Sequence, residues 1–215
     1  MSAAEMLRHN DIRCLEVMAG FAAADWAAPS LCEDWTNHQL LAHLVVGYCA
    51  APGAFVAEIL RRRGSFDAAN TALACRLAAA REPGELLDDM DRLRTDPRGL
   101  GRVFPKQLLL GDHVTHELDM LYALGRTPHI AADALIAVLR TQVTLPNPFV
   151  PAYRNSRGLR LVATDADWTH GDRRNPVVRG PAAALVSALG HRSAALPQLT
   201  GEGVRILRSR HAPLP

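Results

Sequence analysis

The sequence predicts a mainly α-helical protein that ends in a small α+β module. Through the first two thirds of the 215 residues, apolar side chains recur at the spacing of amphipathic helices. A stretch rich in proline and asparagine follows, and beyond it apolar and polar residues alternate as in strands. We therefore expect a helical bundle over residues 1–147 and an α+β module over residues 155–215.

The expected helices of the bundle are separated by proline and glycine. The first covers about residues 3–24 and ends before Pro29. The second begins at Thr36, which forms a capping box with Gln39, and it extends to about Arg63 with a kink or a break at Pro52. Three further helices are expected, at residues 67–81, 85–94 and 131–143.

One helix is delimited more clearly than the others. Pro105 suits its first turn, and Gly125 suits a left-handed residue just beyond its end. Between them, residues 112–124 read DHVTHELDMLYAL and contain two histidines and three carboxylates. This helix therefore holds the strongest cluster of candidate metal ligands.

The expected C-terminal module alternates strands with one helix. It follows a loop at residues 151–158. The pattern predicts a helix that opens with Pro181 and ends at Leu189. Strands are expected at residues 158–164, 177–179 and 203–207.

Composition narrows the class of protein. The net charge of +2, the absence of a basic stripe and an aromatic content of only 5% give nucleic-acid binding little support. Charges interrupt every apolar stretch before it could span a bilayer, and the N-terminus does not resemble a secretory signal, so we expect a cytoplasmic protein with no membrane partner. The four cysteines form no C-x-x-C pair and are interpreted as buried thiols.

Asp112 and His116 are the strongest candidate pair of ligands. On a helix, residues four apart lie one turn apart on one face, at a separation that a divalent cation can bridge. His43 is the best candidate for a third ligand, because it lies within another strongly helical run, and its small helical neighbours leave room. Two simpler interpretations stay open: a surface hydrogen-bonded couple for the pair and a satisfied core histidine for His43. His113 and Glu117 share the same spacing and are expected to be bystanders.

Two sequence motifs resemble a known family. The segment Cys32-x-x-Trp35-Thr36-x-x-x-Leu40-x-x-His43 is similar to the start of the metal-binding domain of mycothiol-dependent maleylpyruvate isomerase-like proteins, which are four-helix bundles of the DinB-like superfamily. The second family motif, acidic-x-x-x-His-x-x-Asp, matches Asp112, His116 and Asp119. The C-terminal part resembles the family at four places, namely Asp165-x-Asp167-Trp168-x-x-Gly171, Gly180-Pro181-Ala182-Ala183-x-Leu185, Arg192, and Leu199-x-Gly201-x-Gly203.

The resemblance implies a metal site. The metal is usually zinc, and the matching ligands are His43, Asp112 and His116. Asp119 would orient the free ring nitrogen of His116, although an exposed carboxylate without that role is an alternative. This chain departs from the isomerase pattern at the first carboxylate position. The isomerase that it resembles has a glutamate there, whereas this chain has Asp112. The shorter side chain would give a tighter site, a different metal preference or a degenerate site.

The resemblance also implies a reaction class. The cosubstrate would be mycothiol, the small thiol of actinobacteria, and the protein would be an isomerase or S-transferase acting on a small electrophile, as a monomer or homodimer. Arg179 or Arg192 could pair with a substrate carboxylate, or could simply lie on the surface. Two alternatives stay open: a non-catalytic bundle that binds a metal or another ligand, and a zinc-dependent hydrolase of small molecules.

Overall fold

The structure, a computed structural model, describes residues 1–32, 35–147 and 150–211. The described chain is mainly helical and contains one three-stranded sheet, which confirms the expected fold class. It divides into two compact units, Met1–Leu109 and Leu110–Pro215. The expected domain boundary between residues 147 and 155 stays a prediction, and residues 148 and 149 of it lie outside the described residues.

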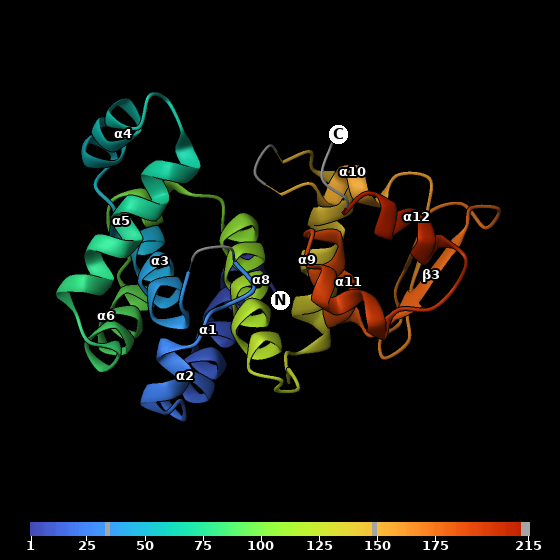
Figure 1. Ribbon diagram of the computed structural model, residues 1–215, viewed down its shortest axis with the longest axis horizontal. Coiled ribbons are helices and arrows are strands. Elements are labelled where there is room, and N and C mark those ends of the chain that lie inside the picture. Colours follow the sequence, from blue (N-terminus) through green and yellow to red (C-terminus); the bar gives the residue numbers. More distant parts are fainter. Residues whose placement is uncertain (33–34, 148–149, 212–215) are drawn as a thin grey trace. The chain divides into compact units, whose positions relative to one another are not determined.

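Helices alone build the first unit. At its centre α3 packs against α5 and α6, and α1 packs against α6 (Figure 1). The helices of the unit are α1 (Ala3–Ala19), α2 (Ala23–Ala27), α3 (Asn37–Cys49), α4 (Pro52–Arg61), α5 (Phe66–Ala80), α6 (Pro83–Thr95) and α7 (Leu100–Val103).

Local sequence signals set the ends of these helices. The capping box at Thr36 is confirmed, because its hydroxyl accepts from the backbone N–H of Gln39 while the Gln39 side chain accepts from the backbone N–H of Thr36. Pro52 divides the expected long helix, since α3 ends at Cys49 and Pro52 opens α4 in the first turn. The first helix is shorter than expected because Gly20 ends α1 before the separate helix α2 begins.

The core of the first unit lies along α3. Leu40, Leu41 and Leu44 are completely buried there. A buried hydrogen bond also ties α3 to α1, because the Tyr48 hydroxyl donates to the Asp11 carboxylate. Burial of the hydroxyl and the nearby Asp11 charge raise the pKa of Tyr48. The position of α3 is therefore set by both apolar packing and a buried polar contact.

The helix α8 (Lys106–Ala123) crosses the division between the units. It lies where the interval between Pro105 and Gly125 predicts it, and Gly125 has the left-handed φ of 64° that the sequence suggested. In the described chain, no helix combines the length and the apolar character needed to cross a membrane.

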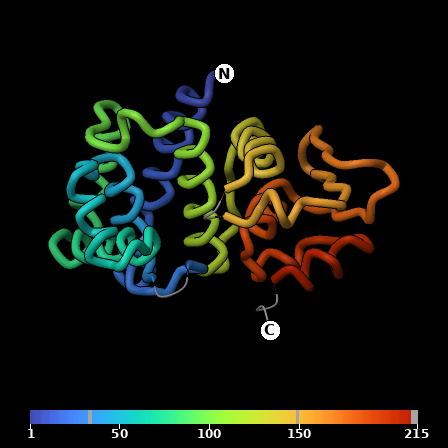
Figure 2. The backbone as a smooth tube through the Cα atoms, turned by 90° about the horizontal axis from the view of Figure 1, so that it is seen from above, coloured from blue at the N-terminus to red at the C-terminus, as the bar shows by residue number. Residues whose placement is uncertain are grey.

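The second unit combines helices with the small sheet, and Figure 2 traces its chain. The strand order is β2-β1-β3, with β2 antiparallel and β3 parallel to β1. Helix α11 packs against β1, β3 and α9. The elements of this unit beyond α8 are α9 (Ala132–Thr144), α10 (Ala152–Ser156), β1 (Arg160–Ala163), β2 (Thr169–His170), β3 (Val177–Gly180), α11 (Ala182–Leu189), the 3-10 helix η1 (Ser193–Gln198) and α12 (Gly203–Ser209).

Two expectations for this unit are wrong. The expected loop at residues 151–158 contains α10, and the expected strand at residues 203–207 is part of α12. The edge of β3 pairs instead with Thr200, which exchanges two backbone hydrogen bonds of 2.8 Å with Arg179. Gly201 then turns the chain with a φ of 104°, and a five-residue apolar pattern too short to tell strand from helix forms a helix.

Candidate metal centre

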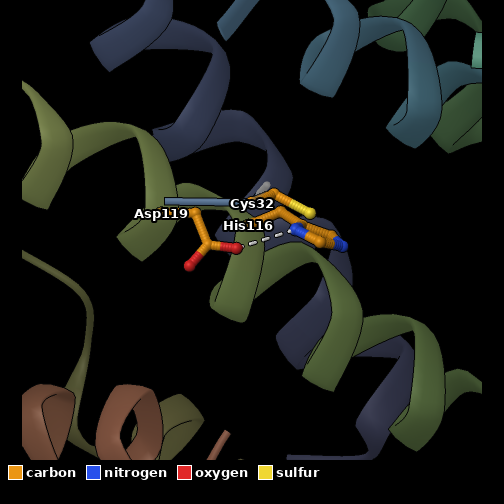
Figure 3. Close-up of side chains that lie close together, drawn as sticks. All are labelled: Cys32, His116 and Asp119. Atoms are coloured by element: carbon orange, nitrogen blue, oxygen red, sulfur yellow. Dashed lines mark hydrogen bonds and ion pairs between the residues drawn. The ribbon is translucent and has the colours of Figure 1, made fainter. Parts of the chain in front are cut away.

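Helix α8 brings the three residues of the second motif onto one face. His116 lies between the two carboxylates, four residues after Asp112 and three before Asp119. Its Nε2 lies 3.4 Å from an Asp112 oxygen, and its Nδ1 lies 3.0 Å from an Asp119 oxygen. Figure 3 shows the second of these contacts, made along α8. The expected pairing of Asp112 with His116 therefore exists within one helix.

The two carboxylates favour a positive charge on His116. Burial alone would lower the pKa of this imidazole. The charges and hydrogen bonds of Asp112 and Asp119 outweigh burial and raise the pKa to about 9. At neutral pH without a metal, the ring is an imidazolium held between two acceptors. A metal that binds Nε2 must displace the proton held there.

Asp119 is fixed from a second direction by Arg192. The guanidinium lies just after α11 and donates from Nε to Oδ1 at 2.9 Å and from Nη2 to Oδ2 at 2.7 Å. A third donor, Nη1, bonds the Gly190 carbonyl at 2.7 Å. Burial raises the pKa of Asp119, but the bonds and charges of His116 and Arg192 outweigh it and lower the pKa below its ordinary value.

An ionised Asp119 has a direct consequence for His116. The Asp119 carboxylate is completely buried and accepts a hydrogen bond from Nδ1 of His116, so it holds the ring in one orientation. Once the Nε2 proton is lost, the Nδ1–H bond to Asp119 keeps the lone pair on Nε2. Carboxylates behind ligand histidines do this in many metal sites. The pairing of Asp119 with Arg192 was not expected from the sequence.

His43 in the first unit has a similar arrangement on α3. Its Nδ1 lies 3.1 Å from the amide oxygen of Asn70 on α5, and its ring contacts that of Trp35 at 5.1 Å between centroids. An acceptor at Nδ1 again leaves Nε2 as the ligand atom. Because His43 and the α8 pair belong to different compact units, their meeting at one metal stays a prediction.

The donor set fits a divalent transition metal. Two imidazoles with oxygen acceptors behind their Nδ1 atoms, together with one carboxylate, would form a histidine and carboxylate set that zinc accepts, if the three predicted ligands meet. Three such ligands leave one position open in a tetrahedral site, as catalytic zinc sites require.

The remaining candidate residues lie in unlike surroundings. His113 and Glu117 are both buried, so they are not the surface couple that their spacing allowed. Arg179 is exposed on β3, and its backbone pairs with Thr200. Arg192 directs three of its donors at Asp119 and Gly190. A role for either arginine in substrate binding stays a prediction.

Comparison with known proteins points in one direction. Residues 7–105 match the family described as the mycothiol maleylpyruvate isomerase N-terminal domain. Crystal structures of the mycothiol-dependent maleylpyruvate isomerase and of a histidine-to-alanine mutant of it are similar in fold, each with a TM-score of 0.59 at 15% identity over 93% of this chain and 91% of that one. No curated protein matches the chain.

Proposed function

We propose that this protein is a metal-dependent enzyme that uses a small thiol, because residues 7–105 match the family of mycothiol maleylpyruvate isomerase N-terminal domains. The thiol is mycothiol, and the reaction is an isomerisation or an S-transfer on a small electrophile. His43, Asp112 and His116 would hold the metal, with zinc the expected ion.

One observation carries this proposal. His116 lies between Asp112 and Asp119 on α8, with Nδ1 on the buried Asp119 and Nε2 beside the partly exposed Asp112. Two carboxylates around His116, one of them fixed by an arginine, set the orientation of the imidazole as well as its charge. The same set orients a ligand histidine and supplies a carboxylate ligand on the adjacent turn.

Each side chain has a defined task in the proposed mechanism. A divalent cation held by the three ligands would supply the positive charge that stabilises a thiolate at neutral pH. Asp119 keeps His116 oriented, and Arg192 keeps Asp119 ionised and fixed. Asn70 keeps His43 oriented, because its amide oxygen lies at the Nδ1 atom of that ring. The proton that the thiol loses passes to solvent.

The thiolate acts as the nucleophile in both reactions. In an isomerisation, a carbon–sulfur bond forms as the thiolate adds to a conjugated alkene, and the alkene pair moves toward the conjugated carbonyl. The former double bond rotates, the pair returns and the carbon–sulfur bond breaks, which regenerates the thiolate. In an S-transfer, the sulfur stays on carbon and a leaving group departs with its bonding pair.

Metal content is the first test of the proposal. The purified protein should retain about one equivalent of zinc, because three protein ligands hold it. His43→Ala and His116→Ala should each lose that metal, while His129→Ala, at an exposed position beyond α8, serves as the control. Variants that bind zinc like the parent protein would remove His43 or His116 from the site.

A non-catalytic bundle that keeps the site as a relic is the second candidate. Asp112 favours this second candidate. The isomerase pattern has a glutamate at this position, and the aspartate side chain is shorter by one methylene. Thiol conjugation of a maleate-like or halogenated electrophile separates the two candidates. Conjugation that is lost in His116→Ala supports the enzyme, whereas a zinc-loaded protein without conjugation supports the relic.

A further inference from the structure

A hollow opens on the first unit between α3, α5, α6 and the segment before α7. Its volume is about 400 Å³. This size lies within the range of small-molecule sites, which is roughly 300–1,000 Å³. All of the residues that line it belong to the first unit, so the hollow exists within that compact unit.

The base of the hollow is apolar. Val45, Leu77 and Leu93 line it together with the half-buried thiol of Cys49. At 100° per residue, Val45 and Cys49 lie about 160° and about 120° around α3 from His43. The hollow therefore opens on a different face of α3 from the candidate metal ligand, and it is separate from the candidate metal centre.

The rim of the hollow is positively charged. Arg81, Arg92 and Arg98 line it, against the single carboxylate of Asp89. Arg92 forms an ion pair with Asp89. Arg81 forms an ion pair with Glu85 at 3.1 Å, and about half of the Arg81 side chain and half of the Glu85 side chain are exposed. In the part of the chain that the structure describes, the Arg98 guanidinium lines the hollow without an ion pair to a carboxylate, so its donors are available to a ligand.

We propose that this hollow binds a small organic anion, with its carboxylate or phosphate on the arginine rim and its carbon body on the apolar base. Guanidinium groups present planar forks of donors that match both head groups. Two of the three arginines pair with Asp89 and Glu85, so the rim keeps the charge of Arg98 as its surplus, which favours an anion over a neutral ligand. The valine and leucine side chains favour an anion with an apolar body over a bare inorganic ion.

Cys49 provides a local reporter of occupancy. Burial and the charge of Asp89 raise the pKa of its thiol, while Arg98 opposes that rise. A ligand seated on the base would cover the sulfur and slow its alkylation. Peptide mass spectrometry follows Cys49 separately from the other three cysteines, and the ratio of rates with and without ligand corrects for any change in the intrinsic reactivity of a variant.

The experiment uses the full chain and three probes that share one ring. Benzoate carries a carboxylate, phenyl phosphate carries a phosphate, and benzamide is neutral. Cys49 alkylation and the thermal midpoint are measured against each probe at constant ionic strength. Arg98→Gln removes the unpaired rim charge, and Arg140→Gln, at an exposed position of α9, removes one positive charge elsewhere.

Saturable protection of Cys49 by benzoate or phenyl phosphate, with a raised midpoint and without an effect of benzamide, is the expected result. The better of the two anions identifies the head group. Arg98→Gln should weaken that protection at least about tenfold, as losing a charged hydrogen bond predicts, and Arg140→Gln should leave it unchanged. Equal protection by benzamide, equal protection in Arg98→Gln, or no protection by either anion would overturn the proposal.

Discussion

The Arg192 guanidinium holds both carboxylate oxygens of Asp119, at 2.9 Å and 2.7 Å, across 73 residues of the chain. Asp119 is completely buried and Arg192 is mostly buried, so this is an ion pair that water screens weakly. Through Asp119 the pair also fixes His116. Stability and metal binding should therefore both depend on Arg192.

Arg192→Ala should lower the free energy of unfolding by about 3 kcal/mol, because it leaves the Asp119 charge buried with one partner fewer. Urea unfolding of the metal-free protein measures this cost. Arg179→Ala, at an exposed position on β3, is the matched control and should change stability by less than about 0.5 kcal/mol. An Arg192→Ala protein as stable as the control would show that the ion pair contributes nothing.

The stability of the metal-free protein should fall as the pH rises. The fold raises the pKa of His116 from an ordinary 6.5 to about 9, so folding favours the protonated ring. That contribution is complete below pH 6.5 and is lost as the pH rises through about 9, at most about 3 kcal/mol in all. Urea unfolding at a series of pH values measures it.

Two variants isolate the part that His116 plays in this pH dependence. His116→Gln removes the titrating ring and should flatten the pH profile over that interval. Asp112→Asn keeps the ring but removes one of the charges that raise its pKa, so the loss of stability should be smaller and should be complete at lower pH. A profile that is unchanged in both variants would assign the pH dependence to other groups.

Zinc affinity should rise with pH over the same interval. The ion competes with the proton on Nε2 of His116, so each unit of pH below the pKa weakens binding by up to about tenfold. Competition with a chromophoric chelator measures the affinity. An affinity that is independent of pH between neutrality and about pH 9 would contradict ligation by a His116 whose pKa is raised.

Much of the fold and part of the candidate site could be predicted from local sequence. Asp112, His116 and Asp119 lie within two turns of one helix, and helical spacing alone brings them together. The contacts of Arg192 with Asp119 and of Asn70 with His43 escaped prediction because each pair meets through tertiary packing, across 73 and 27 residues respectively. No periodic pattern encodes such a pair. The strand expected at residues 203–207 was wrong for a related reason, since the pairing of Thr200 with Arg179 is decided outside that segment.

The hydrogen bond between Tyr48 and Asp11 should contribute measurably to the first unit. Tyr48→Phe keeps the ring and removes the donor from a completely buried carboxylate. Hydrogen bonds to charged groups contribute about 1.5–3 kcal/mol, so we expect a loss within that range in urea unfolding. Tyr153→Phe removes a hydroxyl that accepts an exposed bond from Arg157, and it should cost less than about 0.5 kcal/mol.

Asn70 should raise the affinity for zinc through its hydrogen bond to His43. Asn70→Ala removes the acceptor at Nδ1, which frees the ring to rotate and lowers the basicity of Nε2. Loss of such a group behind a ligand histidine typically weakens metal affinity about 10–100-fold. The chelator competition measures this loss, with Thr71→Ala, the next residue of α5, as control.

The contrast with His43→Ala decides how the Asn70 result is interpreted. If His43 is a ligand, His43→Ala should lose more affinity than Asn70→Ala, and the double variant should lose no more than His43→Ala alone, because Asn70 acts only through the ring. Additive losses would mean that Asn70 affects the site by another route. Parent-like zinc affinity in all three variants would exclude His43 from the metal site, and would leave Asp112 and His116 as a two-residue pair on α8.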